Sequence, residues 1–480
     1  MATTRRLRAT RPARPALDPG IDAIRREMDL PDAFPPEVDV AAAHAAAHPS
    51  LPELDRTDLP LVTVDPPGAM DLDQALHVER RGDGYVVHYA IADVAAFVRP
   101  GDPVDVEAHR RGETLYGAAS RIPLHPPVLS EAAGSLLPDA VRPALLWTIE
   151  LDRTGEGTTV DVRRALVRSR ARLDYAGLQA RIDAGDADPM WAVLREIGEL
   201  RIQREQRRGG VSLPLPDQEI EVREDGCWRL AFRARHPIED WNEQISLLTG
   251  MAAAHLMTTH GVGLLRTLPE PRPEAIARLR RTARGLRIAW PEDCDYPGFI
   301  RSLDPSEPRH VAMMVASTTV LRGAGYVAFA GDVPAQPMHS ALASTYTHVT
   351  APLRRLVDRY TGELCVALCA GQPPPDWVLE ALPTLPATMA DADRRAAQYE
   401  RAVIDLAESL VLARRVGERF AATVVEVDRR DARQGVVVLE DLAIEARVAS
   451  DAALPLGAGV QVELLAADPA QRRIHFHVVA

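Results

Sequence analysis

The chain has 480 residues, an apolar share of 46% and a formal net charge of −12, which predicts two or three folded domains and excludes a mainly disordered protein. No run reaches the roughly 18–20 uncharged apolar residues of a membrane span, and the Arg-rich N-terminus lacks the apolar core of a signal peptide. We therefore expect a cytoplasmic protein that does not contact a membrane. The acidic charge argues against a protein that coats nucleic acid non-specifically, but it allows an enzyme whose cations line one channel.

All 56 basic residues are arginines. A chain without lysine has no Schiff-base lysine, no P-loop lysine and no lysine general base. Arginine must therefore supply every cation, and its planar guanidinium suits the clamping of phosphate.

The N-terminal region, residues 1–57, begins with an Arg- and Pro-rich stretch. For residues 1–20 we expect a disordered basic tail. Short helices are predicted over residues 22–28 and 41–48, the second of which ends before Pro49. No complete small β-barrel fits into this region.

Three aspartates, Asp65, Asp71 and Asp73, lie around a Pro-Pro-Gly turn. Short β-prone segments at 61–64 and 75–78 flank the turn, so the chain reverses and can bring the carboxylates together. Packed carboxylates repel unless a cation holds them, and hard oxygen ligands suit Mg²⁺ or Mn²⁺. Taken alone, this spacing favours three solvated loop aspartates over a metal site.

The middle of the chain, residues 58–417, alternates between helical and β-type apolar patterns and predicts an α+β core. Helices are expected over 104–116, 191–208, 238–259 and 387–416, and strands over 84–98, 145–152, 158–170, 218–222 and 227–232. Asp93 lies inside an apolar strand, and we expect a structural role for it.

Residues 345–360 form a second stretch whose residues suggest a functional site. Thr350 is a suitable N-cap and Pro352 fits the first turn, so we expect a helix to begin there. Its free N–H groups and dipole would create an anion site beside Arg354. The alternative is a surface helix on which Arg354 and Asp358 pair at i, i+4, and the stretch alone slightly favours this alternative.

The last segment, residues 418–480, has the sequence pattern of short β-strands. Five short strands are expected at 420–427, 435–439, 443–448, 460–465 and 474–479. Five strands in about 60 residues is the size of an OB-type barrel, a fold that often binds single-stranded nucleic acid.

Five motifs follow one another along the chain. They are Asp65-Pro66-Pro67-Gly68-x-x-Asp71-x-Asp73; Tyr89-Ala90-Ile91-Ala92-Asp93-Val94; Arg111-Gly112-x-Thr114-Leu115-Tyr116 with Ile122-Pro123 and Leu129-Ser130; Tyr346-Thr347-His348-x-Thr350-Ala351-Pro352-Leu353-Arg354-Arg355; and Gln398-Tyr399-Glu400-Arg401. In this order they resemble the ribonuclease II family, the RNB class of hydrolytic 3′-to-5′ exoribonucleases. The resemblance runs from about residue 58 to the C-terminus. It implies an RNB nuclease core of mixed sheets packed with helices around an RNA channel, followed by the OB-type barrel.

The resemblance also implies a reaction, namely Mg²⁺-dependent, processive hydrolysis of single-stranded RNA to nucleoside 5′-monophosphates by a monomer. Mn²⁺ is the alternative ion. The implied metal ligands are Asp65, Asp71, Asp73 and Gln74, and the implied catalytic residues are Asp71, Asp73 and Arg354. Tyr116 would stack on the terminal base, and Glu243, Arg355 and Glu400 would contact the RNA.

Two departures from the family pattern matter for this prediction. Gln74 stands where the family usually has a fourth acid, and its amide oxygen could bind Mg²⁺ only without charge. Typical members carry two cold-shock domains in front of the core, for which residues 1–57 leave no room. We therefore expect the C-terminal barrel to provide more of the RNA binding than it does in typical members.

Two other functions stay open. Gln74 would mark a decayed metal site in a non-catalytic RNA-binding scaffold, or the site would act on single-stranded DNA. The joint presence of Asp65, Asp71, Asp73 and Arg354 favours the ribonuclease.

Overall fold

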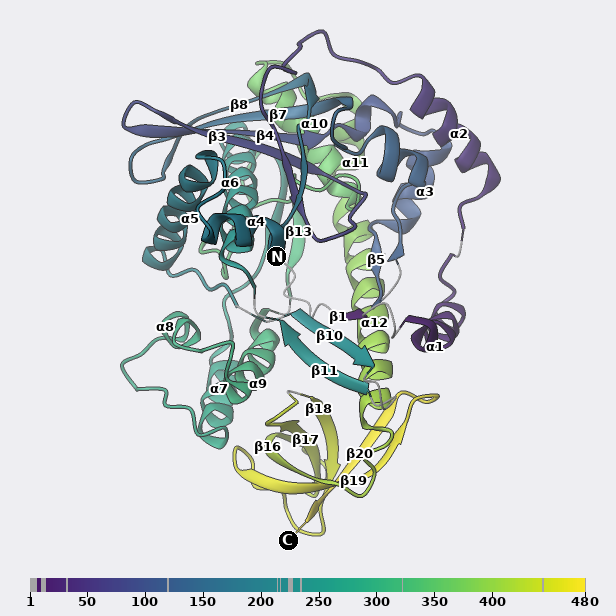
Figure 1. Cartoon of the computed structure of the whole chain (residues 1–480), viewed down its shortest axis with the longest axis vertical. Helices are drawn as coiled ribbons and strands as arrows, with labels where there is room; N and C mark the ends of the chain where they lie inside the picture. Colours follow the sequence, from purple (N-terminus) through teal and green to yellow (C-terminus); the bar gives the residue numbers. More distant parts are fainter. Residues whose placement is uncertain are drawn as a thin grey trace.

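The computed structural model describes residues 7–9, 14–31, 33–118, 121–213, 215, 217–222, 228–233, 235–321, 323–442 and 444–479. These residues form a large α+β core and a closed β-barrel, and the long helix α12 (Leu385–Leu412) runs from the core to the barrel (Figure 1). The predicted fold class is confirmed. Across the described ranges, no helix is both long enough and apolar enough to cross a membrane.

The core is built on one four-stranded antiparallel sheet. Its strands are, in spatial order, β3 (Gln74–Arg81), β4 (Gly84–Ala92), β7 (Val141–Leu151) and β8 (Gly157–Arg168). Every residue of β4 is buried, because this strand lies inside the sheet and both of its faces are covered. Asp93 at its end accepts a hydrogen bond from Arg164 Nε at 2.9 Å, as a structural acid would.

Helices and short strands surround this sheet. The long helices that contact its outer strands are α5 (Met190–Arg207), α6 (Pro237–His260) and α10 (Leu356–Cys369). The other helices are α1 (Arg14–Glu27), α2 (Pro36–Ala47), α3 (Pro103–Arg111), α4 (Tyr175–Asp183), α7 (Pro273–Gly285), α8 (Tyr296–Arg301), α9 (Pro308–Ser317) and α11 (Asp376–Ala381). The short strands are β1 (Leu7–Ala9), β2 (Thr63–Asp65), β5 (Leu115–Tyr116), β6 (Arg121–Ile122), β9 (Arg172–Asp174), β10 (Asp217–Val222), β11 (Trp228–Arg233), β12 (Val262–Thr267), β13 (Gly325–Ala330), β14 (Met338–His339) and β15 (Ser344–Thr345).

The barrel at the end of the chain closes in the order β16-β17-β18-β20-β19. Its strands are β16 (Arg419–Val427), β17 (Gln434–Leu439), β18 (Glu445–Ala449), β19 (Gly459–Asp468) and β20 (Arg473–Val479). The rings of Phe420 and Phe476 pack edge to face inside it, with centroids 5.7 Å apart. The prediction of five strands in an OB-type barrel is confirmed.

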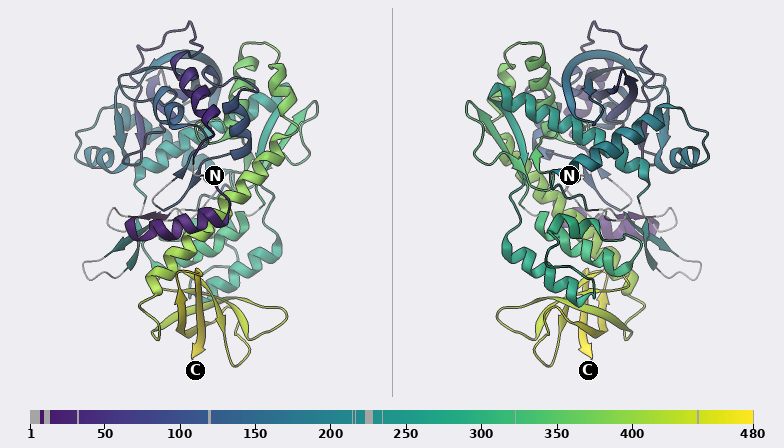
Figure 2. Two further views of the ribbon diagram at one scale, coloured as in Figure 1. Left: turned by 90° about the vertical axis from the view of Figure 1, so that its right-hand side faces the viewer. Right: turned by 90° about the vertical axis from the view of Figure 1, so that its left-hand side faces the viewer.

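Helix α1 corrects the prediction of a disordered tail over residues 1–20. The helix begins at Arg14, and residues 1–6 and 10–13 lie outside the described part. Leu17, Ile21 and Ile24 are at most 2% exposed because α1 crosses α12 and packs on its apolar face (Figure 2). Burial against a distant helix is not visible in the local composition.

Two predicted helix boundaries are also wrong. Helix α3 ends at Arg111 instead of continuing to residue 116, because Gly112 takes φ +73° and passes so close to α12 that a Cβ there would lie 2.4 Å from the Cβ of Ala392. Helix α10 begins at Leu356 instead of Thr350. The residues just before it form tertiary contacts that a continuous helix would prevent.

Candidate active site

The loop that carries Asp71 and Asp73, called the aspartate loop, connects β2 to β3. Hydrogen bonds to Ser135 hold it in place. Leu72 is fully buried and lies between Asp71 and Asp73 in this loop. Ser135 Oγ accepts a hydrogen bond from Leu72 N at 3.0 Å and donates one to Met70 O at 2.6 Å. These two hydrogen bonds fix the backbone on either side of Asp71.

Asp73 joins the aspartate loop to the segment that precedes α10. Its carboxylate accepts hydrogen bonds from Leu353 N at 2.8 Å and from Arg354 Nε at 3.0 Å. Asp73 is 3% exposed, and this burial raises its pKa to about 7, although Arg354 acts in the opposite direction. The two stretches that the sequence singled out therefore meet at one carboxylate.

Asp65 and Asp71 complete the acidic part of the site. Burial raises the pKa of Asp65 to about 6, opposed by Arg354 and increased by the nearby Asp71. Asp71 accepts a 2.5 Å hydrogen bond from Arg121 Nη1, and it also contributes to the raised pKa of Asp73. The three carboxyl groups thus share one electrostatic environment.

The segment before α10 pairs with the end of α3. Thr114 N donates to Arg354 O at 2.9 Å, and Leu356 N donates to Gly112 O at 3.0 Å. Arg355 forms a two-pronged ion pair with the buried Asp358, both contacts being 2.9 Å. The alternative of a surface pair between Arg354 and Asp358 is therefore wrong, since Asp358 binds Arg355 while Arg354 binds Asp73.

Tyr116 lies beside these charges on the hairpin of β5 and β6, where it pairs with Arg121. Its side chain is 44% exposed, as a ring that stacks on a base must be. Partial desolvation raises the pKa of Tyr116, and the charges acting on it are those of Arg354, Asp71, Asp73 and Arg121. The structure therefore brings Tyr116 together with the aspartates.

Glu243 and Glu400 approach the site from two helices. Glu243 on α6 is ion-paired with Arg235 at 2.8 Å, and one turn later Ser246 Oγ lies 2.7 Å from Thr350 Oγ1. Glu400 on α12 is near enough to Glu113 to contribute to the raised pKa of that carboxyl. Contact of Glu243, Arg355 or Glu400 with RNA stays a prediction.

Three residues of the site were not singled out by the sequence reasoning: Arg121, Ser135 and Glu113. Burial raises the pKa of Glu113 to about 7, and Asp393 adds to the shift while Arg355 and Arg266 oppose it. Arg121 and Glu113 flank recognisable motif residues, which is the signal that could have indicated them. Nothing in the local sequence indicates Ser135, because its partners are more than 60 residues away.

A hard divalent cation fits this site in its donor chemistry. The donors are carboxylate oxygens, and burial leaves Asp65 and Asp73 with raised pKa values that a cation would lower. As the side chains stand, no three His, Cys, Asp or Glu residues of the described chain are grouped as metal ligands. Arg121 and Arg354 instead provide the positive charge next to Asp71 and Asp73.

Both polar atoms of the Gln74 side-chain amide form hydrogen bonds within the protein. Its Nε2 donates to Thr350 O at 2.6 Å, and its Oε1 accepts from the hydroxyl of the buried Tyr89 at 2.7 Å. These contacts tie β3 and β4 to the segment before α10. They give Gln74 a structural part in the support of the site, and its role as a metal ligand stays a prediction.

We expect Gln74→Ala to lower the free energy of unfolding clearly and to change the affinity for Mg²⁺ little. The substitution leaves the Thr350 carbonyl and the Tyr89 hydroxyl without their partner, which costs about 1–3 kcal/mol. Thermal unfolding and a titration of RNA hydrolysis against Mg²⁺ measure the two effects separately. A large rise in the Mg²⁺ requirement at unchanged stability would instead make Gln74 a ligand.

Comparison with known proteins identifies the fold and the domains. Residues 54–369 match the RNB domain, and residues 418–479 match the RNase II-type exonuclease C-terminal S1 domain. This chain belongs to the RNB-domain family.

Three proteins illustrate what this chain is similar to in sequence or in fold. Ribonuclease R of Escherichia coli (strain K12) is 30% identical over 362 residues, which is 70% of this chain but 43% of that protein. The structure of Mycoplasma genitalium RNase R in complex with ribose methylated single-stranded RNA has a TM-score of 0.81 at 21% identity, covering 96% of this chain and 78% of that one. Yeast Ssd1, described as a pseudonuclease, has a TM-score of 0.68 at 17% identity, covering 95% and 57%.

Proposed function

We propose that this RNB-domain protein is a Mg²⁺-dependent 3′-to-5′ exoribonuclease that degrades single-stranded RNA processively to nucleoside 5′-monophosphates. The observation that carries the proposal is the hydrogen bond between Asp73 and Arg354 inside a group of three aspartates. Family membership and the similarity to ribonuclease R support the reaction class. Action as a monomer in the cytoplasm remains part of the proposal.

Asp65, Asp71 and Asp73 would hold Mg²⁺, with Mn²⁺ as the alternative ion. When bound there, such an ion would supply activation of water and charge stabilisation for the leaving 3′-oxygen. Arg354 lies beside the carboxylate of Asp73 and presents a planar guanidinium to the negative charge that develops on the scissile phosphate. Arg121 holds Asp71 and Ser135 holds the loop, so the carboxylates do not need to be ordered during the reaction.

Tyr116 provides the exposed ring for the terminal base. Stacking tolerates any base because each has a π-face, which agrees with an enzyme that removes nucleotides without regard to sequence. Selection of RNA over DNA would rest on contacts to the 2′-hydroxyl, for which Glu243 is a candidate from its place on α6 near Thr350.

A non-catalytic RNA-binding scaffold is the second candidate. It is favoured by the similarity to the pseudonuclease Ssd1 and by the neutral Gln74 at the place of a family acid. It is disfavoured because the three aspartates and Arg354 are all present and lie together. The two candidates differ in whether any RNA is hydrolysed.

The direction and the products can be tested with single-stranded oligo(A) that is labelled at either end. We expect label at the 3′ end to appear at once as a nucleoside 5′-monophosphate. Label at the 5′ end should remain in a short final fragment, and an excess of unlabelled RNA added after binding should leave bound substrate to be degraded completely. Release of internal fragments would contradict the exonuclease, and release of one nucleotide per encounter would contradict processivity.

The dependence of stability on pH tests the metal site without an activity assay. In the folded protein the pKa values of Asp65 and Asp73 are about 6 and about 7, above the usual value of 3.8. Because the folded state favours the protonated form, stability from these groups is present at low pH and is lost as the pH rises towards 7. Mg²⁺ binds the ionised carboxylates, so we expect it to raise Tm more at pH 8 than at pH 5.

The matched control for this measurement is Asp65→Asn combined with Asp73→Asn. The double variant should lose both the fall in stability with pH and the added effect of Mg²⁺ at pH 8. An equal effect of Mg²⁺ at both pH values, or an effect that persists in the double variant, would contradict metal binding by these two residues.

A further inference from the structure

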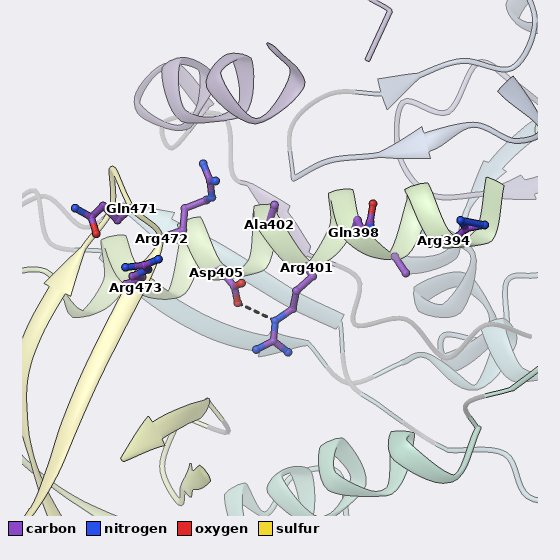
Figure 3. A pocket seen from close by; sticks show the side chains of 9 residues that line it. Arg394, Gln398, Arg401, Ala402, Asp405, Gln471, Arg472 and Arg473 are labelled. Atoms are coloured by element: carbon purple, nitrogen blue, oxygen red, sulfur yellow. Dashed lines mark hydrogen bonds and ion pairs between the residues drawn. The ribbon is translucent and has the colours of Figure 1, made fainter. Parts of the chain in front are cut away.

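Arg121 contacts two acids at once, and one of them is a candidate metal ligand. Its Nη1 donates to Asp71 Oδ1 at 2.5 Å, and its Nη2 lies 2.6 Å from Glu131 Oε1. Arg401 on α12 shows a simpler arrangement, in which it pairs with Asp405 one turn along the same helix (Figure 3). The two partners of Arg121 differ in what else they could bind, because only Asp71 belongs to the group of three aspartates.

The positions of these two acids are linked through one segment of the chain. Glu131 lies in a short helical turn, Leu129–Ala133, part of which is buried. Ser135, which follows this turn, forms the two hydrogen bonds that fix the aspartate loop on either side of Asp71. Arg121 therefore has one acid on each side, and the same segment places both of them.

Arg354, which binds another of the aspartates, lacks a second acid of this kind. Its Nε donates to Asp73 at 3.0 Å, and within the described ranges no further acid forms an ion pair with it. Release of Asp73 would leave the Arg354 guanidinium without an ionic partner. Of these two arginines, Arg121 is therefore the one that can release its aspartate and keep an ion pair.

A divalent cation and Arg121 compete for the carboxylate of Asp71. A divalent ion needs the carboxylate oxygens as ligands, and two cations at one carboxylate repel each other. Two of the three aspartates are paired with an arginine in the structure, which leaves less negative charge for the ion than three carboxylates would supply. Movement of Arg121 away from Asp71 restores one of these charges.

Release from Asp71 does not require Arg121 to break its contact with Glu131. Because Nη2 already lies at Glu131, a rotation of the guanidinium exchanges a contact with two acids for a two-pronged contact with one. The side chains of Arg121 and Glu131 are 27% and 28% exposed, against 13% for Asp71, so water can reach the new pair more easily. Both features lower the cost of leaving Asp71.

We propose that Arg121 is a displaceable counter-ion of Asp71, which holds this carboxylate in place until Mg²⁺ binds it and then pairs with Glu131 alone. The inference rests on the proposed function for the identity of the ion. It implies that Arg121 weakens the binding of Mg²⁺, and that Glu131 strengthens it by giving the arginine an alternative partner. The two residues would thus set the Mg²⁺ concentration at which the site fills.

The test measures the affinity for Mg²⁺ without RNA, from the rise of Tm with Mg²⁺ concentration at pH 8. This pH is above the pKa values of Asp65 and Asp73, which are about 6 and about 7, and the concentration dependence gives a Kd even for a variant that is less stable without the ion. Arg121→Gln should lower the Kd for Mg²⁺ by about 10-fold, the effect of one charged hydrogen bond. Glu131→Gln should raise it by about 3-fold, the effect of a partly exposed ion pair.

The double variant, Arg121→Gln with Glu131→Gln, shows how Glu131 acts. If Glu131 acts through Arg121, its removal has no further effect once the arginine is gone, and the double variant should bind Mg²⁺ as Arg121→Gln does. Arg99→Gln removes an arginine at an exposed position and should bind Mg²⁺ as the unchanged protein does. Glu131→Gln alone decides the matter if Arg121→Gln does not fold, because the inference requires weaker Mg²⁺ binding in that variant.

An affinity for Mg²⁺ that is unchanged or lower in Arg121→Gln, or unchanged in Glu131→Gln, would overturn the inference. A double variant that binds Mg²⁺ about 3-fold more weakly than Arg121→Gln would also overturn it, since Glu131 would then act on the ion directly. If the affinities shift as expected but RNA is not hydrolysed with Mg²⁺, the displacement stands and the nuclease function fails. If RNA is hydrolysed and the affinities do not shift, the displacement fails.

Discussion

Asp73→Asn should reduce RNA hydrolysis by a factor on the order of a thousand or more, because a lost metal ligand removes several kcal/mol of transition-state stabilisation. The asparagine oxygen can still accept the hydrogen bond from Leu353 N, so the loop should keep its place. Asp73 is 3% exposed and offers no surface to RNA. We therefore expect the Kd for RNA to change little.

Single-turnover hydrolysis and fluorescence anisotropy measure these two quantities. Asp83→Asn is the matched control, because Asp83 lies exposed in the turn between β3 and β4 and should leave both unchanged. Hydrolysis by Asp73→Asn at a rate close to that of the unchanged protein would mean that the site has been misplaced. Loss of binding together with hydrolysis would point to a structural role for Asp73.

Arg354→Ala should reduce hydrolysis by about 10²–10³-fold, the usual effect of removing one group that stabilises transition-state charge. The substitution also removes the guanidinium that lowers the pKa of Asp73. Without it the pKa of Asp73 rises further, so the pH profile of hydrolysis should shift to higher pH. Arg354→Lys should recover only part of the rate, since an ammonium group lacks the planar fork.

The pH profile separates a catalytic role of Arg354 from a loss of folding. Thermal unfolding in EDTA reports the cost of leaving Asp73 buried without its partner, and Mg²⁺ should restore part of it. Arg99→Ala, at an exposed position, serves as the control. A rate within threefold of the unchanged protein, or an unshifted profile, would exclude the proposed role of Arg354.

Much of the architecture follows from local sequence patterns. The barrel strands, the β7–β8 hairpin and helices α5 and α6 were expected from apolar periodicity and turn residues, and the structure has them within a few residues. The aspartate loop and Arg354 were expected to act together through the resemblance to a family. The structure adds the direct contact between Asp73 and Arg354.

The errors share one physical cause, which is contact between distant parts of the chain. Thr350 has the chemistry of an N-cap, but its hydroxyl meets Ser246 and its carbonyl accepts from Gln74, so α10 begins later. Helix α1 is held by α12, far away in sequence. Local propensity is a weak prior that tertiary contacts override.

The roles of individual site residues were only partly predictable for the same reason. Gln74 was expected at the metal because it follows Asp73, and the structure adds two hydrogen bonds of its amide, to Thr350 and Tyr89, that the local sequence does not indicate. Arg121 and Glu113 act through partners on other elements. A sequence motif identifies the residues that belong to the site. The fold determines which of these residues are in contact with one another.

The measurement that tests the central claim most directly compares labelled oligo(A) RNA and its DNA analogue, each with Mg²⁺ and with EDTA. The account predicts that RNA is shortened from its 3′ end only with Mg²⁺, and that DNA stays intact. RNA that stays intact with Mg²⁺ would contradict a nuclease at Asp65, Asp71, Asp73 and Arg354. Equal shortening of the DNA would contradict a ribonuclease.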